Sequence, residues 1–145
     1  MKPIPSHQIG GASHSHRYCL MCGRDNPLSF GLCFQPDREN GVTALFQGDD
    51  SLQGYTGIIH GGVLSALLDT AMAQCLLQQG IEAVTGELNV RFSQSVDCHS
   101  ILTIRAWIDE TLPPLYHLRA EIRVNGDRVC RAKGRFMQRK NHENG

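Results

Sequence analysis

The sequence predicts an α+β domain in which an antiparallel β-sheet wraps around one long central helix. The first observation is the segment 61–79, whose apolar residues would cover most of the circumference of a helix. Such a helix belongs inside the protein. The second observation is that, after Gly80, apolar and polar residues alternate. Alternation gives each strand one dry and one wet face, as in an antiparallel sheet that is covered on one side.

The elements before the first long strand are a hairpin and the helix. Two short apolar runs at 32–35 and 42–47 flank the turn sequence ProAspArgGluAsnGly, and they predict the hairpin. The helix should end at Gly80, because a residue without Cβ suits the left-handed conformation that often follows a helix.

Four alternating segments follow at 84–92, 102–108, 116–124 and 130–136. On the first segment, the residues expected to face the helix are Val84, Leu88, Val90 and Phe92. The alternation therefore predicts four long strands after the helix.

The register of the last two strands depends on the loop that joins them. A two-residue loop would place Ile122 opposite Val129, which breaks the inward alternation. A three-residue loop at 125–127 pairs Ile122 with Cys130 instead. We therefore expect the three-residue loop.

Composition and length exclude several classes of protein. The 145 residues fit one domain, and 14 basic residues balance 14 acidic ones, so no charge drives binding to nucleic acid or an anionic membrane. No apolar run is long enough to span a bilayer, and the first residues lack the apolar core of a secretory signal. The expected location is cytoplasmic. The expected organisation is a mobile arm at 1–17, a single domain at 18–140 and a tail at 141–145.

The helix carries the most informative motif. His60 is followed by Gly61 and Gly62, whose amides lie in the first helical turn and lack acceptors within the helix. Asp69 lies between Leu68 and Thr70 in the middle of this apolar helix, where an unpaired carboxylate would cost several kcal/mol. A structural alternative is that Asp69 accepts a backbone hydrogen bond or pairs with an arginine such as Arg91 across an interface.

This motif, followed by a strand reading ThrGlyGluLeuAsnValArgPhe, resembles the hotdog-fold acyl-CoA thioesterases of the PaaI type. The resemblance implies that Gly61 and Gly62 polarise the thioester carbonyl and that Asp69, from the neighbouring subunit, acts as nucleophile or as base for water. It also implies a catalytic role for Thr85. The geometry of a helix agrees with a shared site, because Gly61 and Asp69 would be roughly 12 Å apart along one axis. A homodimer or a homotetramer built as a dimer of dimers is therefore expected.

The resemblance is incomplete in front of the histidine. Some family members have an asparagine about six residues before the histidine, where this chain has Gly54, with Gln53 beside it. Gln53 is the predicted substitute. With it, His60 and Arg91 are the predicted substrate-binding residues, and we expect His60 to position the loop that enters the helix.

The six cysteines are expected to be thiols in a reducing compartment. Cys19 and Cys22 form a CysLeuMetCysGly sequence, with His14, His16 and Cys33 nearby in the chain. A single Cys-x-x-Cys pair without a second pair is a weak metal signal, so we expect no metal and no cofactor.

The sequence therefore predicts an acyl-CoA thioesterase that takes an acyl- or aryl-CoA as its partner. Two alternatives remain. One is a hotdog protein that binds or senses acyl-CoA without turnover, and the other is a hotdog dehydratase acting on an acyl-carrier substrate.

Overall fold

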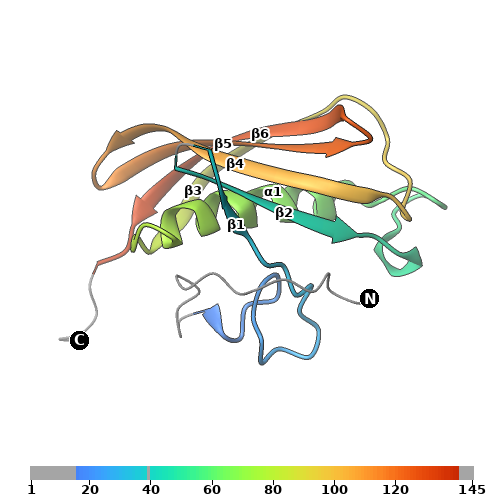
Figure 1. Cartoon of the computed structure of the whole chain (residues 1–145), viewed down its shortest axis with the longest axis horizontal. Coiled ribbons are helices and arrows are strands. Elements are labelled where there is room, and N and C mark those ends of the chain that lie inside the picture. Colours follow the sequence, from blue (N-terminus) through green and yellow to red (C-terminus); the bar gives the residue numbers. More distant parts are fainter. Residues whose placement is uncertain (1–15, 39, 141–145) are drawn as a thin grey trace.

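The computed structural model describes residues 16–38 and 40–140, and they form one six-stranded antiparallel sheet with a single long helix packed on it (Figure 1). The strands follow the order β1-β2-β4-β5-β6-β3 across the sheet. The elements are β1 (Gln35–Asp37), β2 (Gly41–Gln47), the short 3-10 helix η2 (Asp50–Leu52), α1 (Gly61–Leu77), β3 (Ala83–Phe92), β4 (Ile101–Leu112), β5 (Leu115–Val124) and β6 (Asp127–Gln138). This is the predicted hotdog architecture.

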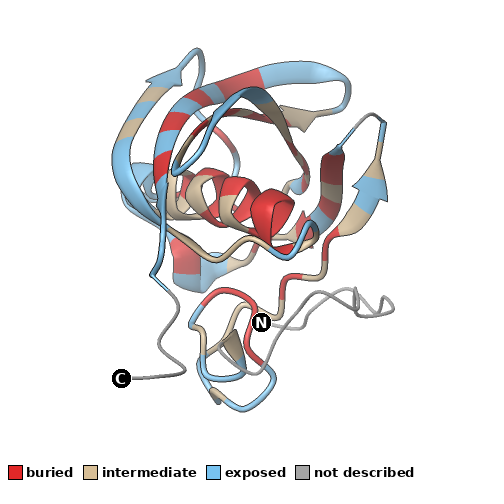
Figure 2. Ribbon diagram, turned by 90° about the vertical axis from the view of Figure 1, so that its left-hand side faces the viewer, coloured by how far each residue is buried: buried red, intermediate tan, exposed pale blue. Residues whose placement is uncertain are grey.

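The helix lies inside the curve of the sheet, which is seen along the helix in Figure 2. Ten of the seventeen residues of α1 are buried, and Leu67, Leu68, Ala71, Met72 and Leu76 are fully enclosed. The sheet contributes buried residues from alternate positions, such as Leu102, Ile104 and Ala106 on β4. The prediction of a central apolar helix wrapped by a sheet with one dry face is confirmed.

The helix ends two residues before the predicted limit of residue 79. Its last residue is Leu77, Gln78 is the C-cap, and Gly80 adopts the expected left-handed conformation with φ of +77°. The amide of Ile81 donates to the Leu76 carbonyl, which closes the end of the helix.

The first hairpin exists, but its first strand is displaced from the predicted 32–35 to Gln35–Asp37. Leu32 and Phe34 are buried in the core instead of pairing with β2. The amide of Leu32 donates to the Met21 carbonyl, so this part of the chain pairs with the segment before it. In the sequence, a loop whose apolar residues fill the core gives the same pattern as a short strand.

A bulge in β3 changes which residues face the helix. Thr85 pairs with Phe136 and Glu87 with Arg135, so Gly86 is an extra residue in the ladder. Paired residues in an antiparallel sheet share a face, and Phe136 is buried, so Thr85 faces the helix. Val84, predicted to face inward, is instead 53% exposed.

The last hairpin has the predicted register at Ile122, but its loop is shorter than predicted. Ile122 pairs with Cys130, but Val124 pairs with Asp127, so the loop contains only two residues. Asn125 and Gly126 both have positive φ, which suits such a tight turn. The register shifts just after Ile122, which leaves Val129 as an extra, bulged residue. The bulge, and not a three-residue loop, therefore brings Ile122 opposite Cys130.

The segment 16–34 runs as turns and lies below the helix in Figures 1 and 2. Arg17 pairs with Asp25 at 2.7 Å at the start of this segment. The rest of the predicted arm and the tail at 141–145 lie outside the described residues.

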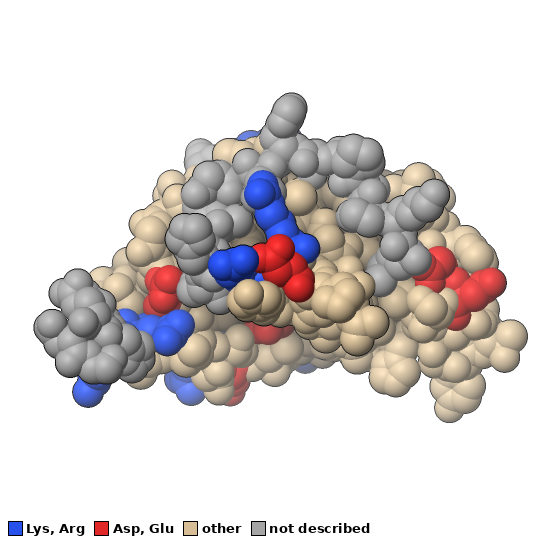
Figure 3. Space-filling view, turned by 90° about the horizontal axis from the view of Figure 1, so that it is seen from below, with Lys and Arg blue, Asp and Glu red and all other residues tan. Residues whose placement is uncertain are grey.

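In Figure 3, basic and acidic side chains mostly lie next to one another on the face seen from below. Among the described residues, no helix is long and apolar enough to cross a membrane.

Candidate active site

The site begins at the N-terminus of α1, where His60 is the N-cap. The amide of Gly62 donates a hydrogen bond to Nδ1 of His60 at 2.8 Å, which satisfies one of the free amides of the first turn. The amides of Val63 and Leu64 donate to the His60 carbonyl. No described residue accepts a hydrogen bond from the amide of Gly61. The free donor at this helix start is therefore Gly61, while Gly62 is held by His60.

Two glycines make room for the His60 side chain. A Cβ placed on Gly62 would lie 3.0 Å from Nδ1 of His60, and a Cβ placed on Gly54 would lie 3.4 Å from its Cδ2. The first contact is closer than ordinary packing, and a Cβ on Gly54 would also lie 3.3 Å from Cα of His60. Gly54, which stands where some family members have asparagine, therefore packs against His60. The predicted role of His60 in positioning the loop stays a prediction.

Asp69 and Thr85 are brought together on the side of α1 that faces β3. Oγ1 of Thr85 donates to Oδ1 of Asp69 at 2.6 Å. Asp69 is half-buried and Thr85 is exposed, so solvent can reach this pair on the side of β3 that faces the helix. The bulge at Gly86 gives Thr85 this orientation.

Gly61 and Asp69 lie on the same helix, eight residues apart, which corresponds to roughly 12 Å along the axis. The aromatic ring of Phe92, at the end of β3, lies near Gly61, because a Cβ on Gly61 would be 3.7 Å from its Cζ. Phe92 is itself 51% exposed. One chain thus presents a helix-start amide at one end of β3 and a carboxylate near the other.

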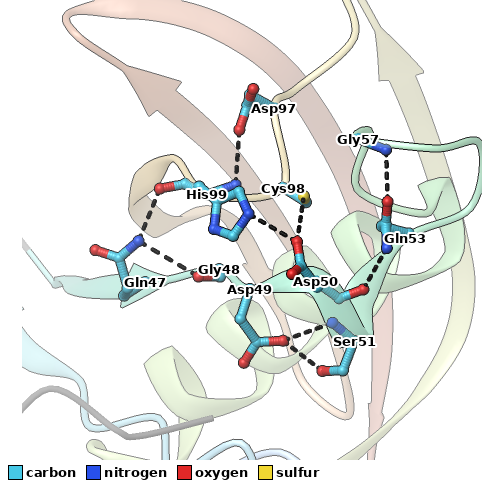
Figure 4. A network of polar contacts seen from close by, with 10 residues as sticks. All are labelled: Gln47, Gly48, Asp49, Asp50, Ser51, Gln53, Gly57, Asp97, Cys98 and His99. Atoms are coloured by element: carbon cyan, nitrogen blue, oxygen red, sulfur yellow. Dashed lines mark hydrogen bonds and ion pairs between the residues drawn. The ribbon is translucent and has the colours of Figure 1, made fainter.

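Gln53 does not point toward this helix start as a free donor. Its Nε2 donates to the Asp50 carbonyl at 2.7 Å, and its Oε1 accepts from the Gly57 amide at 2.6 Å (Figure 4). Both ends of the side-chain amide therefore hold its own loop together. The predicted replacement of the missing asparagine by Gln53 has no geometric support.

The loop that carries Gln53 is fastened to the segment 97–99. Nε2 of His99 lies 2.7 Å from Oδ1 of Asp50, and the thiol of Cys98 also points to this carboxylate (Figure 4). Asp50, Cys98 and His99 have metal-ligating atoms within 4.8 Å of one another, but Asp50 and His99 are exposed. These contacts hold the loop before the helix.

Arg91 lies on the opposite face of the sheet from Asp69. It pairs with Arg131, whereas its neighbour Val90 pairs with the inward Ala132. Arg91 lines a hollow of about 440 Å³ on the outer face, together with Trp107, Arg119 and Glu121. Arg91 is therefore turned away from Asp69 of its own chain. Its predicted role in substrate binding, and the alternative that it pairs with Asp69 across an interface, stay predictions.

A second group of reactive side chains lies in the segment before β1. His16, Cys19 and Cys22 have metal-ligating atoms within 4.8 Å of one another. Hydrogen bonds from Cys22 and then from His16 hold the pKa of Cys19 well below its usual range. The same neighbour, Cys19, and then burial raise the pKa of Cys22. Sequence reasoning gave this group no role, because a single Cys-x-x-Cys pair without a second pair is a weak metal signal.

Comparison with known proteins identifies the class to which this fold and site belong. The family model described as the thioesterase superfamily matches residues 56–131, a little over half of the chain, and this match includes the helix motif and Thr85. The chain belongs to the thioesterase superfamily.

Among curated proteins, the chain is similar to the acyl-coenzyme A thioesterase THEM4 of Bos taurus, with 32% identity over 61% of this chain and 36% of the relative. It is also similar to the human acyl-coenzyme A thioesterase THEM5, with 31% identity over 57% of this chain and 33% of the relative. The matched region spans about a third of the length of these curated relatives.

Solved structures share the fold at low sequence identity. A hypothetical thioesterase from Streptococcus pneumoniae TIGR4, solved with coenzyme A, has a TM-score of 0.69 and 20% identity, over 74% of this chain and 87% of that one. The E. coli PaaI protein of the phenylacetic acid degradation operon has a TM-score of 0.72 and 20% identity, over 77% of this chain and 82% of that one.

Proposed function

We propose that this chain is an acyl-CoA thioesterase that hydrolyses the thioester of an acyl- or aryl-CoA to the free acid and CoA. The observation that carries the proposal is the pair formed by Asp69 and Thr85, at 2.6 Å, on the accessible side of a helix that begins with a free amide. A carboxylate held by a hydroxyl in this position serves as a nucleophile or a general base.

The chemistry follows from the two ends of the site. The thioester carbonyl oxygen accepts a hydrogen bond from the Gly61 amide, at the positive end of the helix dipole, where negative charge develops. Asp69 either attacks the carbonyl carbon, forming an anhydride that water opens, or takes a proton from water as the water attacks. In both routes the carbon–sulfur bond breaks, and the CoA thiolate leaves and takes up a proton. Thr85 orients the carboxylate.

The site requires two chains, because Gly61 and Asp69 of one helix are too far apart for one thioester carbon. A homodimer, alone or within a tetramer, brings Asp69 of one chain to Gly61 of the other. The position of β3 supports this arrangement, since β3 lies at one edge of the sheet and none of the described strands pairs with its outer side along its ten residues. Proteins seldom leave such an edge open. Val84 and Phe92, both about half exposed on β3, add apolar surface to the same region.

Two features of the similar structures support the proposal. The S. pneumoniae thioesterase was solved with coenzyme A, which agrees with an acyl-CoA ligand. The same protein was also solved as two alanine variants, one at an aspartate and one at a threonine sixteen positions later in its chain. Asp69 and Thr85 are likewise sixteen positions apart.

The proposal is tested with Asp69→Asn, which keeps the shape of the side chain but removes its charge. We expect CoA release to fall by roughly a hundredfold or more, because neither a nucleophile nor a base remains. The measurement is thiol release from a panel of acyl- and aryl-CoAs, read with a disulfide dye. The matched control is Asp109→Asn, which breaks only an exposed ion pair with Arg119 and should keep its activity. Normal turnover by folded Asp69→Asn would reject the assignment, and CoA binding without turnover by the unmodified protein would favour the non-catalytic alternative.

A further inference from the structure

The segment before β1 contains a cluster of soft metal ligands that the thioesterase chemistry does not use. His16, Cys19 and Cys22 place one imidazole nitrogen and two sulfur atoms within 4.8 Å of one another. Nδ1 of His16 lies 3.5 Å from Sγ of Cys22. Thiolates and imidazole are the ligands that structural zinc prefers.

The turn that contains the two cysteines is built around the sulfur of Cys19. The amide of Met21 donates to this sulfur at 3.4 Å, and the Gly23 amide donates to the Cys19 carbonyl at 2.8 Å. A Cβ on Gly23 would lie 2.4 Å from the Cys19 nitrogen and 2.6 Å from the Arg17 carbonyl oxygen, so only glycine fits. The glycine thus lets the chain fold tightly around a sulfur that accepts backbone hydrogen bonds, an environment that suits a thiolate.

The sulfur of Cys22 receives a donor from the core helix. Nε2 of Gln74 lies 3.2 Å from Sγ of Cys22, and Gln74 is only 3% exposed. A buried side-chain amide needs a polar partner, and for Gln74 that partner is the sulfur of Cys22. Donors of this kind, one step outside the metal, orient and tune ligating atoms.

Both sulfurs are therefore supplied with hydrogen-bond donors, which stabilise negative charge on them when the thiol protons are lost. A cation between the two sulfurs would balance the repulsion between the resulting thiolates and use the nearby imidazole as a third ligand. We propose that His16, Cys19 and Cys22 bind a zinc ion that fastens the segment 16–34 to α1. The thiol protons are released to solvent when the metal binds.

The fourth ligand of a closed zinc site is expected from the chain that follows the turn. The amides of Phe30 and Leu32 donate to the carbonyls of Leu20 and Met21, which brings Cys33 alongside the turn. The sulfur of Cys33 is not one of the three ligand atoms that lie within 4.8 Å of one another, so it would turn toward them when the metal binds. We assign Cys33 to the fourth position, which gives a Cys₃His site.

The first experiment measures zinc in the full chain purified with a reductant, by elemental analysis after dialysis against metal-free buffer. We expect about one zinc per chain, and loss of zinc in His16→Ala, Cys19→Ser and Cys22→Ser. Cys75→Ser is the matched control, because Cys75 is a buried thiol that donates to the Asn40 carbonyl and serine can keep this bond. Less than a tenth of an equivalent of zinc in the unmodified chain after incubation with excess zinc would overturn the proposal. So would a Cys19–Cys22 disulfide that persists under reductant, detected as a mass lower by two hydrogens.

The second experiment replaces zinc with Co²⁺, whose visible absorption reports the ligands. We expect intense tetrahedral bands together with sulfur-to-cobalt charge transfer, and weaker charge transfer in Cys33→Ser. An unchanged spectrum in Cys33→Ser would overturn its assignment as the fourth ligand. Gln74→Leu should lower zinc affinity by roughly tenfold to a hundredfold in competition with a chelating dye, because it removes the donor to Cys22. Unchanged zinc affinity in a folded Gln74→Leu protein would show that Gln74 serves packing alone.

Discussion

Asp69 and Thr85 form the hydrogen bond on which the proposed chemistry depends. The hydroxyl of Thr85 restricts the carboxylate at 2.6 Å, and a hydrogen bond to a charged group contributes about 1.5–3 kcal/mol. Thr85→Val keeps the branched shape and removes the hydroxyl. We expect kcat to fall roughly tenfold or more with little change in KM, because orientation of the carboxylate matters most in the transition state. Steady-state kinetics on the best acyl-CoA check this.

Thr85→Ser is the control for this substitution, since serine keeps the hydroxyl and should keep most of the activity. If valine and serine gave the same kcat, Thr85 would be a strand residue without a role in orienting Asp69.

At this scale, the sequence predicted the residues whose position follows from local geometry. His60, Gly61 and Asp69 lie on one helix, so a motif and a helical repeat are enough to place them. Gln53 and Arg91 are different, because their positions depend on contacts that a motif does not contain. Gln53 closes its own loop on Gly57, and Arg91 is turned outward by the pleat of β3.

At the scale of the element, the helix start depends on His60. Its Nδ1 accepts the Gly62 amide, and loss of an N-cap acceptor costs about 1 kcal/mol. His60→Ala should therefore lower the melting temperature by roughly 3 °C. His60→Asn should restore most of this loss, because asparagine is a good N-cap. Differential scanning calorimetry of the three proteins measures the effect, and equal stability of the alanine and asparagine variants would contradict the capping role.

Bulges limited what the pattern of the strands could reveal. The alternation in the sequence suggests that Val84 belongs with Leu88, but the extra residue Gly86 shifts the phase and turns Thr85 inward. In the last hairpin, Val129 is the extra residue, and the two-residue turn keeps its preferred geometry. A bulge adds one residue without an apolar or polar signature, so alternation alone cannot locate it. The order of the helix and the four long strands was predictable, but the phase of two strands was not.

At the scale of the whole molecule, contacts between distant parts of the chain carried the information that the sequence lacked. The side-chain amide of Gln74 donates to the sulfur of Cys22, which lies 52 positions earlier in the chain. This contact gives the buried amide a polar partner. The sequence alone suggested only a weak metal signal at 19–22. In contrast, the proposal of a site shared by two subunits follows from helix geometry, because the rise per residue fixes the separation of Gly61 and Asp69 whatever the sheet does.

A site shared between two chains predicts that two inactive variants restore each other. Asp69→Asn removes the carboxylate, and Gly61→Val blocks the approach of the thioester carbonyl to the free amide. Each homodimer should be nearly inactive. In a mixed dimer, one site combines both defects, while the other pairs Gly61 of the Asp69→Asn chain with Asp69 of the Gly61→Val chain. Random exchange of equal amounts makes half of the dimers mixed, each with one intact site, so thiol release should recover to roughly a quarter of the unmodified rate. Native mass spectrometry confirms the exchange, and verified mixed dimers without activity would mean that each site is built within a single chain.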